Sequence, residues 1–236
     1  MTRWPAPGHT VVEWTARADL RHHPSWLTPQ EHARAARFAP PLGGRWAAAR
    51  CWVRARLADY LGTRPDLVPL EVDQRGRPRV AGADGDFNVS HTDHLLALAV
   101  SGSRVGVDIE ETPRAGTDLI GLARVVGTAE EVDQLAGIPP PERPAAFQRW
   151  WVRKEAVLKA DGAGFLSDAR GVHVGVTRPA PPPSWAVRDH GCLAPGRGHA
   201  STGASTPHTL LATAHEMTGT GPEVVVRAVS PSGLLG

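Results

Sequence analysis

Residues 87–110 read FNVSHTDHLLALAVSGSRVGVDIE, and this stretch decides the fold. It holds three apolar runs, at 87–90, 95–100 and 105–110, separated by short polar segments rich in Ser, Gly, His and Asp. Apolar runs of about four to eight residues between such segments are typical of β-strands joined by tight turns. We therefore expect an antiparallel meander of three strands here.

The chain on either side of this meander shows one plan, helices followed by short strands. Before it, we expect a strand at 10–16, helices at 29–38 and 43–61, and a hairpin of strands at 70–73 and 77–80. After it, we expect helices at 117–126, 128–137 and 143–161, and strands at 172–176, 185–188, 209–214 and 223–229. This pattern predicts an α+β fold of two similar lobes, residues 1–111 and 112–236, each with helices packed on a small antiparallel sheet.

Composition excludes several classes of protein. The 236 residues are 41% apolar, which is enough for a proper core, and the two cysteines form no CxxC motif. The 26 basic and 24 acidic residues nearly balance, whereas a nucleic-acid binder usually shows a clear basic excess. No apolar run approaches the length of a signal peptide or a membrane span, so we expect a cytoplasmic protein that binds neither membrane nor nucleic acid.

Lysine is concentrated in one place. Of the 26 basic residues only Lys154 and Lys159 are lysines, and all the others are arginines. An ammonium acts on phosphate as a compact point charge, whereas guanidinium acts as a planar fork. The two lysines therefore suggest a phosphate-binding segment.

Three groups of polar residues are candidates for a site. Asp108 and Glu110 share one face of a predicted strand, a pattern that suits Mg²⁺ as well as an ordinary solvated face. Glu155 and Lys159 share one face of the predicted helix at 143–161, which suits a ligand site or a plain surface ion pair. Ser90 and His91 end a strand, where they would suit phosphate binding.

Taken together, these motifs resemble a known family. Gly76-Arg77-Pro78, FNVSH at 87–91, GVDIE at 106–110 and WVRKEAVLKADGAG at 151–164 are similar, in order and spacing, to the motifs of the 4′-phosphopantetheinyl transferases, in particular the two-lobed single-chain (Sfp-type) class. The resemblance implies a fold with the active site between the lobes. It also implies a holo-[acyl-carrier-protein] synthase type of transferase that moves 4′-phosphopantetheine from coenzyme A to a carrier-protein serine and releases 3′,5′-ADP.

The resemblance also assigns roles to residues. It implies a Mg²⁺ or Mn²⁺ site at Asp108, Glu110 and Glu155, with Glu155, Lys154 and Asp108 as catalytic residues. The coenzyme A contacts that it implies are Arg34, Arg45, Arg77, Ser90, His91, Lys154 and Lys159. Arg77 stands where relatives carry lysine, and Glu31 where some carry a further base. The expected partners are acyl or peptidyl carriers of fatty-acid, polyketide or nonribosomal-peptide synthases in natural product biosynthesis, served by a monomer.

Three questions stay open on the sequence alone. The general base is Glu155, Glu130 or a water molecule. A metal-dependent pyrophosphate-cleaving enzyme with the same three carboxylates is one alternative function. A non-catalytic protein that binds coenzyme A or carriers is another.

Overall fold

The computed structural model describes residues 3–162, 169–193, 208–217 and 222–229. In this part of the chain the helices are α1 (Pro29–Ala35), α2 (Leu42–Leu61), α3 (Leu119–Val126), α4 (Ala129–Gly137) and α5 (Arg143–Asp161). The strands are β1 (His9–Ala16), β2 (Leu70–Val72), β3 (Pro78–Val80), β4 (Asp86–His91), β5 (Leu95–Ser101), β6 (Val105–Glu111), β7 (Trp185–Leu193), β8 (Thr209–Glu216) and β9 (Glu223–Ala228). The mixed α+β class is confirmed.

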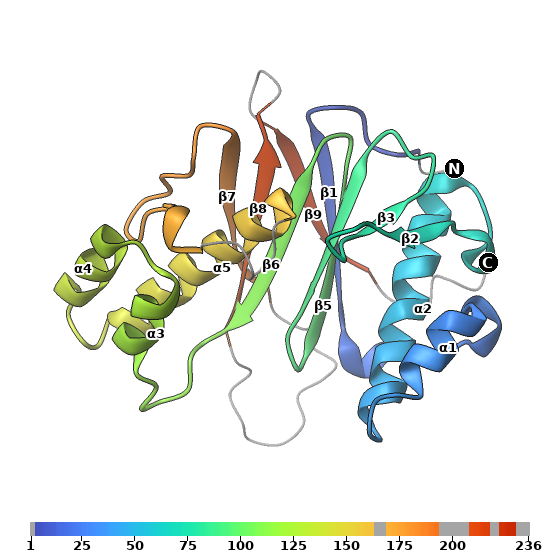
Figure 1. The fold of residues 1–236 in the computed structure, drawn as a ribbon, viewed down its shortest axis with the longest axis horizontal. Helices are drawn as coiled ribbons and strands as arrows, with labels where there is room; N and C mark the ends of the chain where they lie inside the picture. Colours follow the sequence, from blue (N-terminus) through green and yellow to red (C-terminus); the bar gives the residue numbers. More distant parts are fainter. Residues whose placement is uncertain (1–2, 163–168, 194–207, 218–221, 230–236) are drawn as a thin grey trace.

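Two sheets stand side by side between two groups of helices (Figure 1). One sheet has the strand order β4-β5-β1-β9 and the other β6-β8-β7, while β2 and β3 form a separate hairpin. Helices α1 and α2 lie beside the first sheet, and α3, α4 and α5 lie beside the second. Among the described residues, no helix is long and apolar enough to cross a membrane.

Strand β5 shows why the layers stack in this way. All seven of its residues are buried. Alternate side chains point to opposite faces of the strand, and each face packs into a different hydrophobic core. Leu96, Leu98 and Val100 pack with residues of α2. Leu95, Ala97 and Ala99 pack with Val105, Val107 and Ile109 of β6. The first sheet is therefore sandwiched between α2 and the second sheet.

The pairing predicted for 105–110 was wrong. Strands β4 and β5 pair as expected, but β6 pairs with β8 in the other sheet. Side chains of β4 bind the edge of β6 that has no strand partner among the described residues. The backbone N–H groups of Val105, Val107 and Ile109 donate to Asp86 at 3.0 Å, to Asn88 at 3.0 Å and to Ser90 at 3.3 Å, respectively. The three acceptors lie on one face of β4, because side chains two residues apart on a strand point the same way.

The C-terminal strand also crosses the predicted boundary. Strand β9 lies parallel to β1 at the edge of the first sheet. There Glu13 of β1 is fully buried and accepts hydrogen bonds from Arg56 and Tyr60 of α2 and from Arg227 of β9. Each predicted lobe thus supplies one strand to the other sheet, and the boundary at residues 111 and 112 stays a prediction.

The strand predicted at 172–176 is absent, although these residues belong to the described part of the chain. Val174 donates its backbone N–H to Glu131 at 2.8 Å, and Val176 donates its own to Gln134 at 3.2 Å. Because side chains of α4 take these donors, the segment needs no strand partner. Val174 and Val176 pack instead against the hydrophobic cluster that includes α5 residues.

Candidate active site

Strand β6 turns a polar face towards α5. Val107 and Ile109 point into the core between the sheets, so Gly106, Asp108 and Glu110 lie on the opposite face, as the alternation predicted. A Cβ atom at Gly106 would lie only 1.9 Å from the backbone oxygen of Ala156. The missing side chain therefore lets α5 come close enough to bring Glu155 and Lys159 over β6.

Asp108 is the centre of this arrangement. Its side chain is almost fully buried, and its Oδ1 accepts hydrogen bonds from Ser90 Oγ at 2.8 Å and Lys159 Nζ at 2.6 Å. Its Oδ2 is buried with no hydrogen-bond partner. Burial raises the pKa of Asp108, while the Lys159 ammonium acts in the opposite direction. A buried carboxylate oxygen without a donor is costly unless a ligand satisfies it.

Two further carboxylates crowd around Asp108. Burial and the charge of Asp108 raise the pKa of Glu110 to about 7, and the same two causes raise the pKa of Glu155 to about 7. The indole of Trp151 donates to Glu110 at 3.1 Å and holds it in place. The three predicted metal ligands therefore lie near one another and repel.

This cluster suits a hard divalent cation. All its donors are carboxylate oxygens, which Mg²⁺ and Mn²⁺ prefer, and a cation would satisfy Asp108 Oδ2 and offset the repulsion. Among the described residues no group of three or more His, Cys, Asp or Glu side chains is placed closely enough to hold a metal ion as it stands. The donor set therefore fits such a cation, but the carboxylates would have to draw together around it.

The two lysines separate. Lys159 lies in the cluster, where its ammonium contacts Asp108 and also donates to Ser90 Oγ at 3.0 Å. Lys154 is fully buried elsewhere and donates to Glu131 of α4 and to the carbonyl of Val172, both at 2.6 Å. The structure thus does not bring Lys154 to the carboxylates, and a role in contacting substrate stays a prediction.

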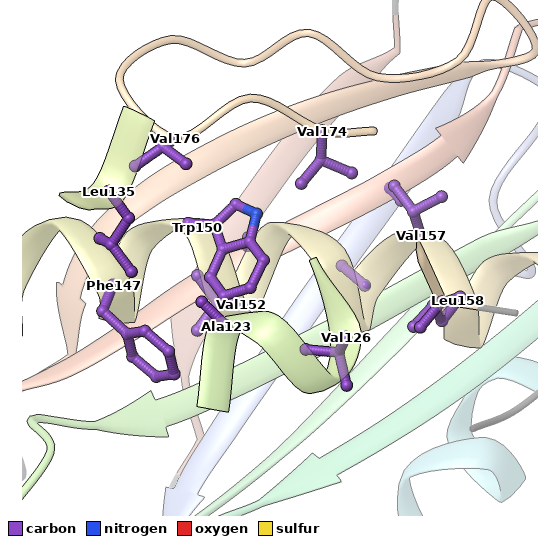
Figure 2. Close-up of a cluster of buried hydrophobic side chains, with 14 of the residues drawn as sticks. Ala123, Val126, Leu135, Phe147, Trp150, Val152, Val157, Leu158, Val174 and Val176 are labelled. Carbon is purple, nitrogen blue, oxygen red and sulfur yellow. The ribbon is translucent and has the colours of Figure 1, made fainter. Parts of the chain in front are cut away.

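Lys154 lies in the hydrophobic core that α5 forms with α3 and α4, which is largely aromatic and aliphatic. Figure 2 shows Trp150 of α5 between Leu135 of α4, Ala123 of α3, Val174 and Val176. The ammonium of Lys154 lies 5.3 Å from the centre of the Trp150 ring. Lys154 therefore joins α5 to α4 inside this core, on a different face of the helix from Glu155.

A cavity of about 220 Å³ opens beside His91. Its polar walls include Arg34 and Arg50, and both guanidinium groups lie 5.5 Å from the centre of the Trp46 ring. Gly76 and Pro78 form part of the opposite wall. The resemblance assigned coenzyme A contacts to Arg34 and His91 but not to Trp46 or Arg50. The excess of arginine over residues 31–56 was the sequence signal for Arg50, and nothing in the sequence singled out Trp46.

Arg45 lies in a different cavity, of about 510 Å³, together with Arg17, Arg21 and His22. Burial lowers the pKa of His91, and the charges of Arg17 and Lys159 lower it further. Arg17 of one cavity and Lys159 of the carboxylate cluster are therefore both near enough to His91, in the other cavity, for their charges to act on it.

Two other predicted residues lie away from the carboxylates. Arg77 bonds to Asp86 and to backbone carbonyls of β6 and α5. Glu130 lies on the exposed side of α4, where it accepts from Gln134 at 3.0 Å. The alternative base Glu130 is therefore not part of the cluster. A contact between Arg77 and coenzyme A stays a prediction.

Comparisons with known proteins agree with these features. Residues 104–189 match the sequence model of the 4′-phosphopantetheinyl transferase superfamily. The chain is 33% identical over 183 residues to the 4′-phosphopantetheinyl transferase HetI of Nostoc sp.. These aligned residues are 71% of this chain and 76% of HetI. It is 35% identical over 126 residues to AcpT of Salmonella typhimurium (52% of this chain, 62% of the relative). A 4′-phosphopantetheinyl transferase of Bacillus subtilis is 29% identical over 113 residues (48% and 49%).

Proposed function

This chain belongs to the 4′-phosphopantetheinyl transferase superfamily, and from this membership and the carboxylate cluster we propose that it transfers 4′-phosphopantetheine from coenzyme A to a serine of a carrier protein. The observation that carries the proposal is the cluster of Asp108, Glu110 and Glu155 beside Lys159. A pyrophosphate needs cationic partners, and a divalent ion held by these carboxylates together with the Lys159 ammonium would supply them. The acceptors proposed are acyl or peptidyl carriers of fatty-acid, polyketide or nonribosomal-peptide synthases, served by a monomeric cytoplasmic enzyme.

The residues that would hold Mg²⁺ are Asp108, Glu110 and Glu155. When bound, the ion would neutralise charge on the pyrophosphate of coenzyme A, an effect worth several kcal/mol in metal-dependent enzymes. Lys159 stands beside the same carboxylates, so its ammonium is the protein's own cation for the pyrophosphate. Ser90 keeps Asp108 oriented, because its hydroxyl donates to Oδ1 and leaves Oδ2 free for the ion.

The nucleotide half of coenzyme A fits the cavity beside His91. Arg34 and Arg50 would supply charge for the 3′-phosphate, and Trp46 a flat apolar surface. From there His91 and Lys159 would lead the pyrophosphate to Asp108. Arg45, which shares its cavity with Arg17 and Arg21, would add attraction for the phosphates.

Transfer needs a base for the carrier serine. We assign this role to Glu155, the carboxylate that α5 brings to the cluster, since a carboxylate placed beside the reacting groups can take a proton. The serine oxygen would attack the phosphorus next to the pantetheine arm, its proton would pass to Glu155, and the bond to 3′,5′-ADP would break. Such general base catalysis contributes about 10²–10⁴ in rate.

Mass spectrometry of purified carriers tests the proposal. After incubation with the enzyme, Mg²⁺ and coenzyme A, one carrier should gain one phosphopantetheine group, and its Ser→Ala variant should gain none. Asp108→Asn enzyme should not transfer. Release of 3′,5′-ADP without any carrier would favour a pyrophosphohydrolase instead. Binding of coenzyme A with no transfer to any carrier would favour a non-catalytic protein.

A further inference from the structure

Arg77 leaves a tight turn between β2 and β3. The carboxylate of Asp73 accepts the backbone N–H groups of Arg75 and Arg77 at 2.8 and 2.9 Å, and Gly76 adopts a φ of +84°. Gly76 and Pro78 line the cavity beside His91, but Arg77 is not among the described residues that do so. The turn therefore sends the arginine side chain away from the cavity wall formed by its neighbours.

The guanidinium of Arg77 joins three elements. One Nη atom donates to the backbone oxygen of Lys159 on α5. The other donates to Asp86 at the start of β4 and, at 2.7 Å, to the backbone oxygen of Val105 at the start of β6. The Arg77 side chain is only 10% exposed. Because a guanidinium has a rigid fork of donors, it can hold all three acceptors at once.

Arg77 contacts α5 at its C-terminal end, where backbone carbonyl groups need hydrogen-bond donors from outside the helix. The last carbonyl groups of a helix lack partners inside the helix and carry partial negative charge. Arg77 takes the carbonyl of Lys159, and Arg104, next to the start of β6, donates to that of Asp161 at 2.7 Å. Two guanidinium groups thus cap the end of α5 from outside.

This cap lies on the two elements that carry the candidate site. β6 supplies Asp108 and Glu110, and the final turns of α5 supply Glu155 and Lys159. We propose that Arg77 is a positioning residue, which fixes the end of α5 against β6 and so keeps Lys159 and Glu155 over Asp108, and that it is not a ligand of coenzyme A. The catalytic part of this inference rests on the function proposed above.

The experiment compares Arg77→Met and Arg77→Lys with Arg79→Met. Arg79 is a matched control, because it lies two residues further along the chain, in β3, but is 61% exposed and pairs at the surface with Glu71. Four quantities are measured: kcat, KM for coenzyme A, the Kd of coenzyme A by calorimetry, and hydrogen exchange of a peptide covering residues 152–162.

For Arg77→Met we expect faster exchange at the end of α5 and a coenzyme A Kd within about fivefold of the wild type, since only the contact of Lys159 would be disturbed. We expect kcat to fall at least about tenfold, since a misplacement of about 1 Å can cost roughly a hundredfold in rate. Arg77→Lys should lie between, because one ammonium cannot reach all three acceptors. Arg79→Met should match the wild type.

Two results would overturn the proposal. A rise of more than about fivefold in the Kd of coenzyme A would make Arg77 a ligand, and faster exchange with unchanged kcat would make it a mere structural brace. If Arg77→Met does not fold, Arg77→Lys and Asp86→Asn carry the same test. If the wild type modifies no carrier, the proposed function fails, while exchange and coenzyme A binding still decide the role of Arg77.

Discussion

Gly106→Ala tests whether the close approach of β6 and α5 builds the site. The added Cβ would lie 1.9 Å from Ala156 O and 2.6 Å from Ala160 N, and both of these are backbone atoms that no side-chain rotation can move. Helix α5 would have to retreat by about 1.5 Å to restore an ordinary contact of 3.4 Å. Glu155 and Lys159 would move with it, away from Asp108.

The expected effects are large on activity and moderate on stability. Overpacking of this kind costs about 1–3 kcal/mol, and each kcal/mol lowers Tm by roughly 2–4 °C in a chain of this size. A displacement beyond 1 Å should reduce kcat about a hundredfold. Thermal unfolding and steady-state transfer to a carrier measure both effects.

Gly137→Ala is the control for this substitution. Gly137 ends α4, and a Cβ there would meet no atom within 4 Å. Tm and kcat should therefore stay near the wild-type values. If Gly106→Ala also kept the wild-type Tm and kcat, α5 would not need to approach β6 this closely, and the account of the site would be refuted.

Three further predictions follow from buried charges. Lys154→Met should lower the free energy of unfolding by about 3–5 kcal/mol in a denaturant titration, since it leaves Glu131 buried without its cation; a change in coenzyme A affinity with normal stability would contradict this. Burial lowers the pKa of His190 from 6.5 to about 4, so between these pH values the unfolded chain binds more protons than the folded one. The free energy of unfolding should therefore decrease as the pH is lowered from 6.5 to about 4. His190→Gln should make this decrease smaller in acid titrations, and an unchanged slope would show that His190 does not contribute. Asp108→Asn should raise Tm in the absence of metal. It should also lose the rise in Tm that Mg²⁺ and coenzyme A cause, a rise that corresponds to a stabilisation of about 2.7 kcal/mol at a hundredfold excess over Kd. If the variant kept the wild-type rise in Tm, Asp108 would not be part of the site.

Local patterns in the sequence predicted the elements that local physics controls. Thr28 and Glu31 form the capping box that begins α1, and Thr128 caps α4, so both helices begin within one residue of the predicted starts at 29 and 128. The alternation along 105–110 correctly placed Asp108 and Glu110 on one face. These features depend on neighbouring residues, so the sequence contains all the information needed.

Pairings between distant residues were harder to predict. The two lysines suggested one phosphate-binding segment, yet they are five residues apart on a helix that turns about 100° per residue, so they face different neighbours. Only the fold shows that Lys154 meets Glu131, a residue that also completes a capping box. The move of β6 to the second sheet depended on side chains of β4, such as Asn88, which no periodicity reveals.

The pairing of β9 with β1 has a consequence for synthesis of the chain. Until residues 223–228 have left the ribosome, β1 exposes an open edge, and Glu13 has Arg56 and Tyr60 but not Arg227. Open strand edges are places where chains pair wrongly with one another. The sheet whose strands are translated first is therefore completed after the second sheet, and β1 keeps one unpaired edge until residues 223–228 have been made.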